Sequence, residues 1–273
     1  MVTSDFVITP TVRLGRLRLL FRYGRFAWRS VGTGDFDFLA RVFRATGRLM
    51  VGSLRDGHKR VRCNICGWQG GSFYPIVGPG YYETATACPR CLCQDRHRAL
   101  VFVLDKRTRF FAPQSEVLEV APMRSFQQYS LERKGGRGYR SFDYERFAME
   151  RGDVTCMRYP SESYDYFLAF HVLEHILDEA KAVAEIRRVL RPGGTAILQV
   201  PIDWSLAHTI EYGGPRRREA GHVRRYGQDF PARLEAAGFR TEAATVRDEC
   251  EEGYRTRHGM SAEPIYFATK PEA

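Results

Sequence analysis

Long hydrophobic runs are missing from this sequence. No apolar stretch approaches the roughly 20 residues that a membrane-spanning helix needs, so the sequence predicts no transmembrane segment. The N-terminus, MVTSDFVITP, lacks a basic stretch followed by an apolar core, and we therefore expect no signal peptide. Internal repeats and low-complexity tracts are missing as well. With 44% hydrophobic and 27% charged residues, the composition is that of an ordinary soluble globular protein.

The cysteine content argues against a disulfide framework. The chain has seven cysteines, an odd number, and five of them fall within residues 63–93. An odd count without a predicted secretion signal favours reduced thiols that bind a metal over disulfide bonds. We therefore expect a cytoplasmic protein.

Acidic residues are scarce in the first 62 residues, which hold 13 Lys and Arg against 4 Asp and Glu. The remaining residues hold 29 against 28, so the net charge of +10 belongs almost entirely to the N-terminal segment. Such a basic patch is typical of proteins that bind RNA, an anionic membrane surface or an acidic partner. A solvated helix face is an equally ordinary explanation.

Residues 1–58 are predicted to form a basic helical segment. Apolar residues from Leu14 to Trp28 recur at helical spacing with arginines between them, and an apolar pattern resumes over residues 36–50. Peripheral attachment to an anionic membrane is one role for such an amphipathic stretch. Packing against the rest of the protein is the commoner role.

Two C-x-x-C pairs lie in a loop-rich stretch, residues 59–98, which we predict to be a zinc-ribbon or zinc-knuckle module. Glycine follows the first pair and proline lies inside the second, as tight metal-binding turns require. Two thiolates from each pair complete a tetrahedron around one Zn²⁺, and four protein ligands leave no open position, so we expect a structural ion. The predicted ligands are Cys63, Cys66, Cys88 and Cys91, with Cys93 and His97 as spare donors.

From about residue 115 onward, predicted strands and helices alternate. This pattern favours an α/β fold with a doubly wound, mostly parallel sheet. A linking helix is expected over residues 99–111, and a short element near Asp153. The sequence predicts strands at 116–120, 139–142, 164–170, 195–200 and 265–269, and helices at 178–190 and 230–237.

Four motifs follow one another at the ends of these predicted strands: VLEVAP, YRSFD, GDVT and FHVLEH, the last leading into a helix that ends in VLRPGG. In this order they resemble the class I S-adenosylmethionine-dependent methyltransferases, particularly the group with a V-L-E-H element. The resemblance covers about residues 115–270. It implies a Rossmann-like, seven-stranded sheet in a methyltransferase domain that we place at residues 99–273.

The resemblance also implies which residues bind the cofactor, S-adenosylmethionine. Glu119 takes the acidic position of the first motif, and the following turn approaches the methionine moiety of the cofactor. The usual glycines of this turn, which let a ligand approach the backbone, are replaced here by Ala121 and Met123. By the same resemblance, Asp143 accepts hydrogen bonds from the ribose and Asp153 contacts the adenine amine. The implied cofactor-binding residues are Glu119, Ala121, Pro122, Asp143, Asp153 and Phe170.

Three histidines are candidate bases. His171 and His175 are expected at the carboxyl end of the fourth strand, where open α/β sheets bind ligands. His222 lies in the segment GHVRRYG, which resembles an H-V-R-x-Y-G element of bacterial methyltransferases with a cysteine-rich N-terminal region. Histidine has a suitable pKa to take a proton from an acceptor. A purely structural role, as a turn held by polar contacts, is the alternative for His222.

We therefore expect an S-adenosylmethionine-dependent methyltransferase that acts on a hydroxyl or amine of a small molecule, such as a natural product, sugar or glycolipid. One alternative is an RNA methyltransferase that uses the zinc module and the basic N-terminus. The sequence lacks the D/N-P-P-Y-type element of many base-amine methylases, which lowers the weight of this alternative. A second alternative, motivated by the missing glycines, is a non-enzymatic scaffold with a degenerate cofactor site.

Overall fold

The largest element of the computed structural model is a seven-stranded sheet. Its strand order is β12-β13-β9-β8-β5-β6-β7. The pairs β5–β6, β5–β8, β6–β7 and β8–β9 are parallel, and β13 runs antiparallel to both of its neighbours. The predicted α/β fold with a mostly parallel sheet is thus confirmed. The structure describes residues 20–28, 36–54, 59–78, 81–144, 148–216 and 219–272.

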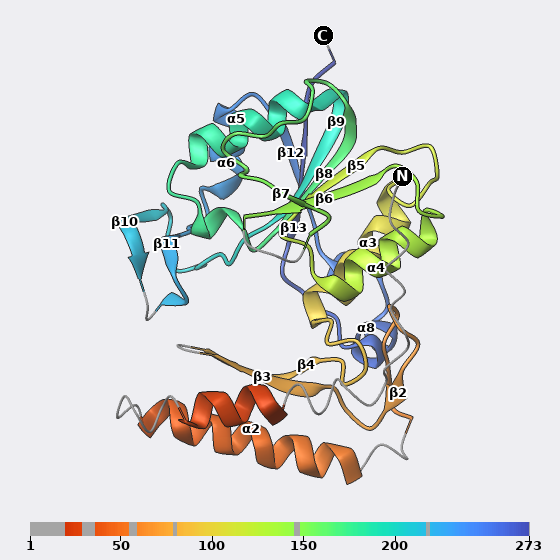
Figure 1. Cartoon of the computed structure of the whole chain (residues 1–273), viewed down its shortest axis with the longest axis vertical. Helices are drawn as coiled ribbons and strands as arrows, with labels where there is room; N and C mark the ends of the chain where they lie inside the picture. The colour runs from red at the N-terminus through yellow and green to blue at the C-terminus, as the bar shows by residue number, and fades with distance from the viewer. Residues whose placement is uncertain are drawn as a thin grey trace.

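The sheet strands are β5 (Val117–Val120), β6 (Tyr139–Asp143), β7 (Glu150–Arg151), β8 (Tyr164–Phe170), β9 (Leu190–Gln199), β12 (Arg240–Ala244) and β13 (Ile265–Thr269). All four residues of β5 are buried. Helices cover both faces of the sheet (Figure 1), which is why the central strands read as nearly continuous apolar runs. The short β7 and the strand β12 were not predicted as strands.

Two apolar clusters form the core, one on each face of the sheet. The first contains the buried face of α5 (Glu179–Val189) and residues of α6 (Phe230–Ala236). The second contains residues of α3 (Asp95–Arg107) and Phe126 of α4 (Arg124–Arg133). Alternate strand residues enter opposite clusters, because successive side chains of a strand point to opposite faces.

Helix α5 follows from local signals in the sequence. The Asp178 carboxylate caps it by accepting a hydrogen bond from the Lys181 amide at 3.0 Å. Its buried face repeats at helical spacing. The strand expected at 195–200 begins earlier, at Leu190, so residues 191–194 extend β9. Two backbone hydrogen bonds hold this extension. The Gly193 amide donates to the Lys270 carbonyl, and the Lys270 amide donates to the Gly194 carbonyl, both at 2.9 Å.

The stretch over residues 60–98 is not simply loop-rich, and this expectation is corrected. It contains β1 (Val61–Arg62), β2 (Gln69–Gly70), β3 (Tyr74–Gly78) and β4 (Tyr81–Ala87). The β3–β4 hairpin packs on α2 (Phe36–Leu54) at the end of the molecule away from α5 (Figure 1). Apolar side chains of α2 and β3 bury one another there, a long-range contact that local patterns do not reveal.

Helical residues 20–28 and α2 lie within the predicted N-terminal segment; Leu14, Leu17 and the rest of that segment lie outside the described residues. The linking helix expected over 99–111 is α3, which begins four residues earlier and ends at Arg107. No helix among the described residues is long and apolar enough to cross a bilayer. The remaining elements are the 3₁₀ helix η1 (Leu173–His175), the hairpin β10 (Ile210–Arg216) and β11 (His222–Arg225), and the helices α7 (Val246–Glu249) and α8 (Glu252–His258).

Candidate functional site

The register of the parallel strands brings the predicted cofactor residues to one edge of the sheet. Val120 of β5 pairs with Phe142 of β6 and with Ala169 of β8. The residues that follow Val120, Phe142 and Ala169 therefore lie at the same carboxyl edge of the sheet. The order of the strands reverses at β5, so the gap between β5 and β8 is the topological switch point where open α/β sheets bind ligands. The residues brought together are Ala121, Asp143 and Phe170, and Gly152-Asp153 follows the neighbouring strand β7.

Ala121 adopts the backbone conformation that glycine usually supplies. Its φ angle is 49°, in the left-handed region, and its amide donates to the Phe142 carbonyl at 2.8 Å. A non-glycine residue in this conformation costs about 1 kcal/mol. The turn thus retains its open shape although the glycine is missing, with Pro122 buried behind it.

Glu119 lies inside the sheet, and its side chain is 4% exposed. The Tyr139 hydroxyl donates a hydrogen bond to its carboxylate. Burial raises the pKa of Glu119 to about 8, although the bond from Tyr139 lowers it. The carboxyl group is therefore mostly protonated at neutral pH, and its role in binding the cofactor stays a prediction.

Asp153 holds its own turn beside the sheet edge. Its Oδ1 accepts hydrogen bonds from the Thr155 amide and hydroxyl, both at 2.8 Å. The residue is exposed, whereas Asp143 is half-buried at the end of β6. Both carboxylates therefore lie at the carboxyl edge in positions that a ligand can reach, and their assigned contacts with ribose and adenine remain predictions.

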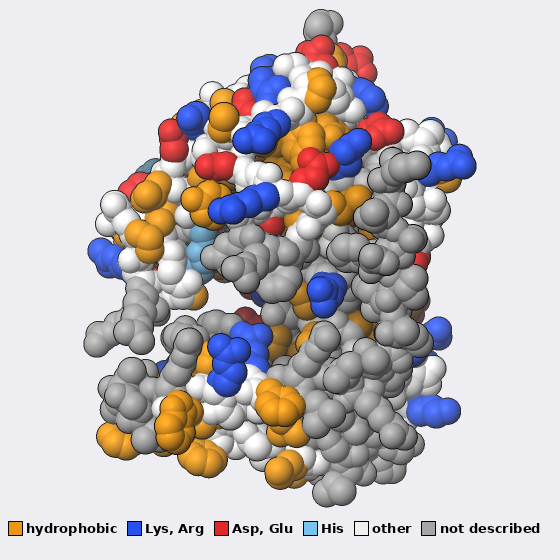
Figure 2. Space-filling model, in the orientation of Figure 1, with side chains coloured by type: hydrophobic (Ala, Val, Ile, Leu, Met, Phe, Trp, Pro, Cys, Tyr) orange, Lys and Arg blue, Asp and Glu red, His pale blue; other side chains and the backbone are white. Residues whose placement is uncertain are grey.

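A cavity of about 1060 Å³ lies next to this edge. Figure 2 shows a hollow between the part of the molecule with the large sheet and the part with the β3–β4 hairpin, with histidine atoms at its rim. The three predicted histidines all line this cavity, so the fold brings them together. The other lining residues come mainly from β4, from the start of α3 and from the loop before β11: Glu83, Thr84, Thr86, Gln94, Asp95, Arg96, Glu174, Pro201, Glu219, Ala220, Gly221, Ser261 and Glu263.

His171 begins the turn after β8 with a φ angle of 55°. Its Nδ1 lies 3.1 Å from Oε1 of Glu174, which is fully buried. Burial alone raises the pKa of Glu174, but the hydrogen-bond and charge effects of His171 outweigh it, so the net shift of this pKa is downward. Glu174 was not predicted as a site residue, although it lies within the FHVLEH motif that drew attention to its neighbours.

The rings of His175 and His222 meet edge to face, with centroids 4.9 Å apart and an angle of 79° between them. His175 is exposed, and His222 is half-buried. Burial lowers the pKa of His222. This shift favours the neutral imidazole of His222, which lines the cavity.

Arg224 holds the turn that carries Glu174 and His175. It is 2% exposed, and its guanidinium donates to the carbonyls of Leu173 at 2.6 Å and Ile176 at 2.7 Å. It also donates to the Leu177 carbonyl at 3.0 Å and pairs with the Glu211 carboxylate at 3.0 Å. In the GHVRRYG segment, Arg224 therefore has the structural role of holding a turn by polar contacts, whereas His222 lines the cavity.

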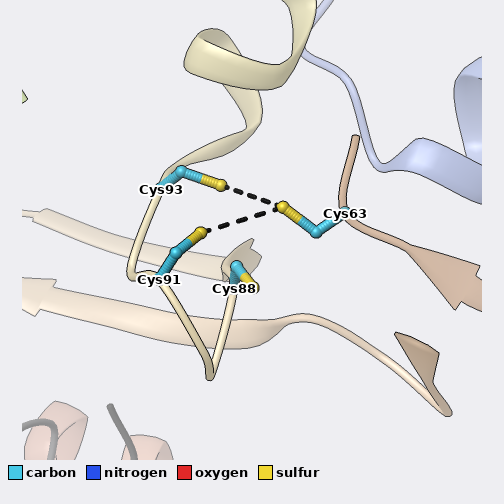
Figure 3. A group of neighbouring side chains, drawn as sticks. All are labelled: Cys63, Cys88, Cys91 and Cys93. Atoms are coloured by element: carbon cyan, nitrogen blue, oxygen red, sulfur yellow. Dashed lines mark hydrogen bonds between the residues drawn. The ribbon is translucent and has the colours of Figure 1, made fainter. Parts of the chain in front are cut away.

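The cysteines gather at a second site, below α3 (Figure 3). Four sulfur atoms, those of Cys63, Cys88, Cys91 and Cys93, lie within 4.8 Å of one another. The predicted ligand Cys66 is close as well, with its sulfur 3.6 Å from that of Cys88. Cys93, predicted only as a spare donor, lies 3.4 Å from the Cys63 sulfur. Five thiols thus converge where four were predicted.

The two C-x-x-C turns have the same backbone hydrogen bonds. The Cys63 amide donates to the carbonyl five residues on, at 2.8 Å, and the Cys88 amide does the same at 2.9 Å. In each turn, the amide four residues after the first cysteine donates back to that cysteine's carbonyl at 2.9 Å. This correspondence makes Cys63 equivalent to Cys88 and Cys66 equivalent to Cys91. Cys93 falls at the position of Trp68, outside the repeated pair.

A buried arginine stands beside the thiols. Arg98 is 0% exposed, and its guanidinium lies 3.7 Å over the Phe73 ring. It donates to the Cys93 carbonyl at 3.2 Å and contacts the Cys93 sulfur at 3.7 Å. Among the described residues, no carboxylate forms an ion pair with it. Its positive charge therefore lies beside the Cys93 sulfur. The other spare donor, His97, lies in the N-terminal cap of α3, where its Nδ1 accepts from the Gln94 amide.

Residues 108–198 match the family model described as a methyltransferase domain. These residues, about a third of the chain, are similar to that domain. The matched segment runs from the end of α3 almost to the end of β9, so it includes the VLEVAP turn, Asp143, Asp153 and the FHVLEH turn.

Two curated relatives are similar to part of the chain. A protein of Mycolicibacterium smegmatis described as a "Probable S-adenosylmethionine-dependent methyltransferase" is 32% identical over 101 residues, 36% of this chain and 37% of that protein. The 27-O-demethylrifamycin SV methyltransferase of Amycolatopsis mediterranei is 31% identical over 126 residues, 44% of this chain and 45% of that protein. The chain thus spans less than half of the length of either relative.

Among solved structures, the S-adenosylmethionine-dependent methyltransferase of Mesorhizobium loti aligns with a TM-score of 0.45 at 14% identity, covering 62% of this chain and 96% of that chain. At this TM-score, the fold assignment rests on the strand order and register described above.

Proposed function

We propose that this protein is an S-adenosylmethionine-dependent methyltransferase whose acceptor is a hydroxyl or amine of a small molecule, such as a natural product, sugar or glycolipid. The observation that carries the proposal is the position of the histidine-lined cavity, whose lining residues His171 and Pro201 follow β8 and β9 at the carboxyl edge of the sheet. Acceptor and cofactor can therefore lie side by side. The family match to residues 108–198 supports the cofactor.

The residues at the carboxyl edge fit this cofactor. The left-handed turn at Ala121 keeps the backbone open, and the carboxylates of Asp143 and Asp153 are the acceptors that ribose hydroxyls and the adenine amine need. When bound, S-adenosylmethionine supplies an electrophilic methyl group. The protein then has to position the acceptor and to take its proton. His171, His175 and His222 are the candidate bases.

The charges around the cavity favour a small neutral or cationic acceptor. Five carboxylates line it, those of Glu83, Asp95, Glu174, Glu219 and Glu263, against the single cation of Arg96. Such a lining repels phosphate groups. It therefore disfavours the RNA alternative for the acceptor in this cavity.

The test is calorimetric binding of S-adenosylmethionine and of its demethylated product, followed by transfer of a labelled methyl group to a panel of alcohols, amines, sugars and RNA. We expect the Asp143→Asn variant to weaken cofactor binding by about tenfold, because each good hydrogen bond to a charged group contributes about 1.5 kcal/mol. The matched control is Asp105→Asn, an exposed carboxylate on α3 that pairs with Arg133. Failure of the wild type to bind the cofactor would support the scaffold alternative instead, and salt-sensitive methylation of RNA alone would support the RNA alternative.

For the cysteine cluster, we propose one structural Zn²⁺ held by Cys63, Cys66, Cys88 and Cys91. The repeated hydrogen bonds of the two turns support this set of four, because they place these cysteines in equivalent positions. A tetrathiolate zinc site carries a net negative charge, and the buried Arg98 offsets it. Cys93 then serves as a buried thiol against Arg98. With all four positions of the ion filled by protein, its role is to fasten β1–β2 to the start of α3.

We further propose that α2 binds an anionic membrane surface. Phe36, Phe43 and Met50, each separated by seven residues, are 73%, 66% and 60% exposed along one line of the helix. The opposite face is the one that packs on β3. Arg44 and Arg48 are exposed on one side of α2, between the apolar line and the buried face. Basic residues beside an apolar line are typical of helices that lie in a lipid interface.

A further inference from the structure

Glu174, His175 and His222 form a compact set of metal-ligand atoms. One ligand atom from each lies within 4.8 Å of the others. The first two come from η1 and the third from β11, so two separate segments of the chain contribute. Arg224 of β11 fixes the two segments together through the carbonyls of η1. The set is therefore held by the fold, not by an exposed loop.

Glu174 carries a second and independent indication of a ligand. It is 0% exposed, and its Oε2 accepts no hydrogen bond from any described residue. The Nδ1 atom of His171 lies 3.1 Å from Oε1. A buried carboxylate without such partners costs several kcal/mol. Oε2 therefore lacks the partner that buried carboxylates ordinarily have.

The surroundings favour a cation at this place. Three histidines line the cavity together with Glu174, and the rest of the lining carries four more carboxylates against Arg96. This negative potential attracts a positively charged ligand. His175 is exposed and His222 half-buried, so the donor set is open to the cavity.

We propose that Glu174, His175 and His222 bind one divalent first-row transition-metal ion. Two imidazoles and one carboxylate on one side of an ion are a common donor set for such metals and leave open positions on the other side. These positions face the cavity. The role of the ion rests on the function proposed above: its open positions would hold an oxygen of the acceptor, leaving His171 as the remaining candidate base.

The experiment uses the full chain with its cysteine cluster loaded with Zn²⁺ and titrates it with Co²⁺ by calorimetry and absorption spectroscopy. Co²⁺ at the cysteine cluster is recognised by thiolate-to-metal charge-transfer absorption, which the proposed site cannot give. We expect one equivalent of Co²⁺ to bind without that absorption. The variants His222→Ala and Glu174→Gln should weaken binding by more than about tenfold.

His208→Ala is the matched control, because the His208 side chain is 88% exposed and lies outside the cluster; its Co²⁺ affinity should equal that of the wild type. If His222→Ala fails to fold, as judged by circular dichroism, His222→Gln takes its place. Absence of the additional Co²⁺ equivalent, or equal affinity in His222→Ala and His208→Ala, would overturn the proposal. Binding of S-adenosylmethionine is measured in the same samples and tests the proposed function separately. The proposal assigns cofactor binding to Asp143 and not to Glu174, His175 and His222.

Discussion

Replacement of Arg224 by alanine is expected to destabilise the turn that carries Glu174 and His175. Arg224 is buried and donates to three backbone carbonyls of this turn, at 2.6, 2.7 and 3.0 Å. Those carbonyls belong to Leu173, Ile176 and Leu177, and Leu173 is itself buried. In the alanine variant, water reaches them incompletely, so part of their hydrogen bonding is lost.

The magnitude follows from the number of bonds. A buried polar group left without a partner costs about 1–3 kcal/mol. The Leu177 end of the turn is exposed and water can replace that bond, so two carbonyls count in full. The ion pair with Glu211 adds little, because the Glu211 side chain is 49% exposed. We expect the free energy of unfolding to fall by about 2–6 kcal/mol.

The assay is urea unfolding, with hydrogen exchange of the amides of residues 173–177 as a local probe. Arg225→Ala is the control, because Arg225 is the next residue along β11, is 42% exposed and pairs with two acids that are each 32% exposed. It should cost at most about 1 kcal/mol. Arg224→Lys keeps the charge but lacks the forked donors, so it should fold while its Co²⁺ affinity falls. Equal unfolding free energies for Arg224→Ala and Arg225→Ala would refute the reasoning.

Three further predictions concern other parts of the molecule. The pKa of Glu119 is raised from about 4.5 to about 8, so the folded state holds a proton that the unfolded state releases. The wild type should therefore lose at most about 5 kcal/mol of stability as pH rises through this window. Glu119→Gln should flatten this pH dependence in thermal melts. Cys88→Ser should remove the bound zinc, measured by mass spectrometry and a lowered melting temperature, whereas Cys156→Ser, at an exposed cysteine away from the cluster, should not. Phe43→Ser should reduce cosedimentation with vesicles of anionic phospholipid severalfold without changing the melting temperature; an unchanged bound fraction would contradict the membrane proposal.

Much of the large sheet could be predicted from local patterns. The strands β5 and β8 are mostly apolar runs, each with a single acidic residue, and α5 has a capping aspartate and an apolar stripe of helical period. These signals depend on a few neighbouring residues. The C-x-x-C spacing is equally local, since two thiolates three residues apart already form half of a tetrahedral site.

The elements that were missed depend on contacts between distant segments. The β3–β4 hairpin is stabilised by α2, and β9 begins at Leu190 because residues 193–194 bond to Lys270. Neither contact leaves a periodic signal in the sequence. The start of α3 at Asp95 is likewise set by its cap at Gln94 and His97, not by its apolar pattern.

The sequence by itself determined the chemistry available to this protein: the cysteine pairs, the acids after the strands and the histidines of the FHVLEH and GHVRRYG segments. Only the tertiary structure decided which of these groups meet. Strand register placed Asp143 and Ala121 at one edge, and the turn held by Arg224 joined Glu174 to His222 across about fifty residues of chain. Side-chain type is a local property, whereas the distance between two side chains depends on the packing of the whole fold.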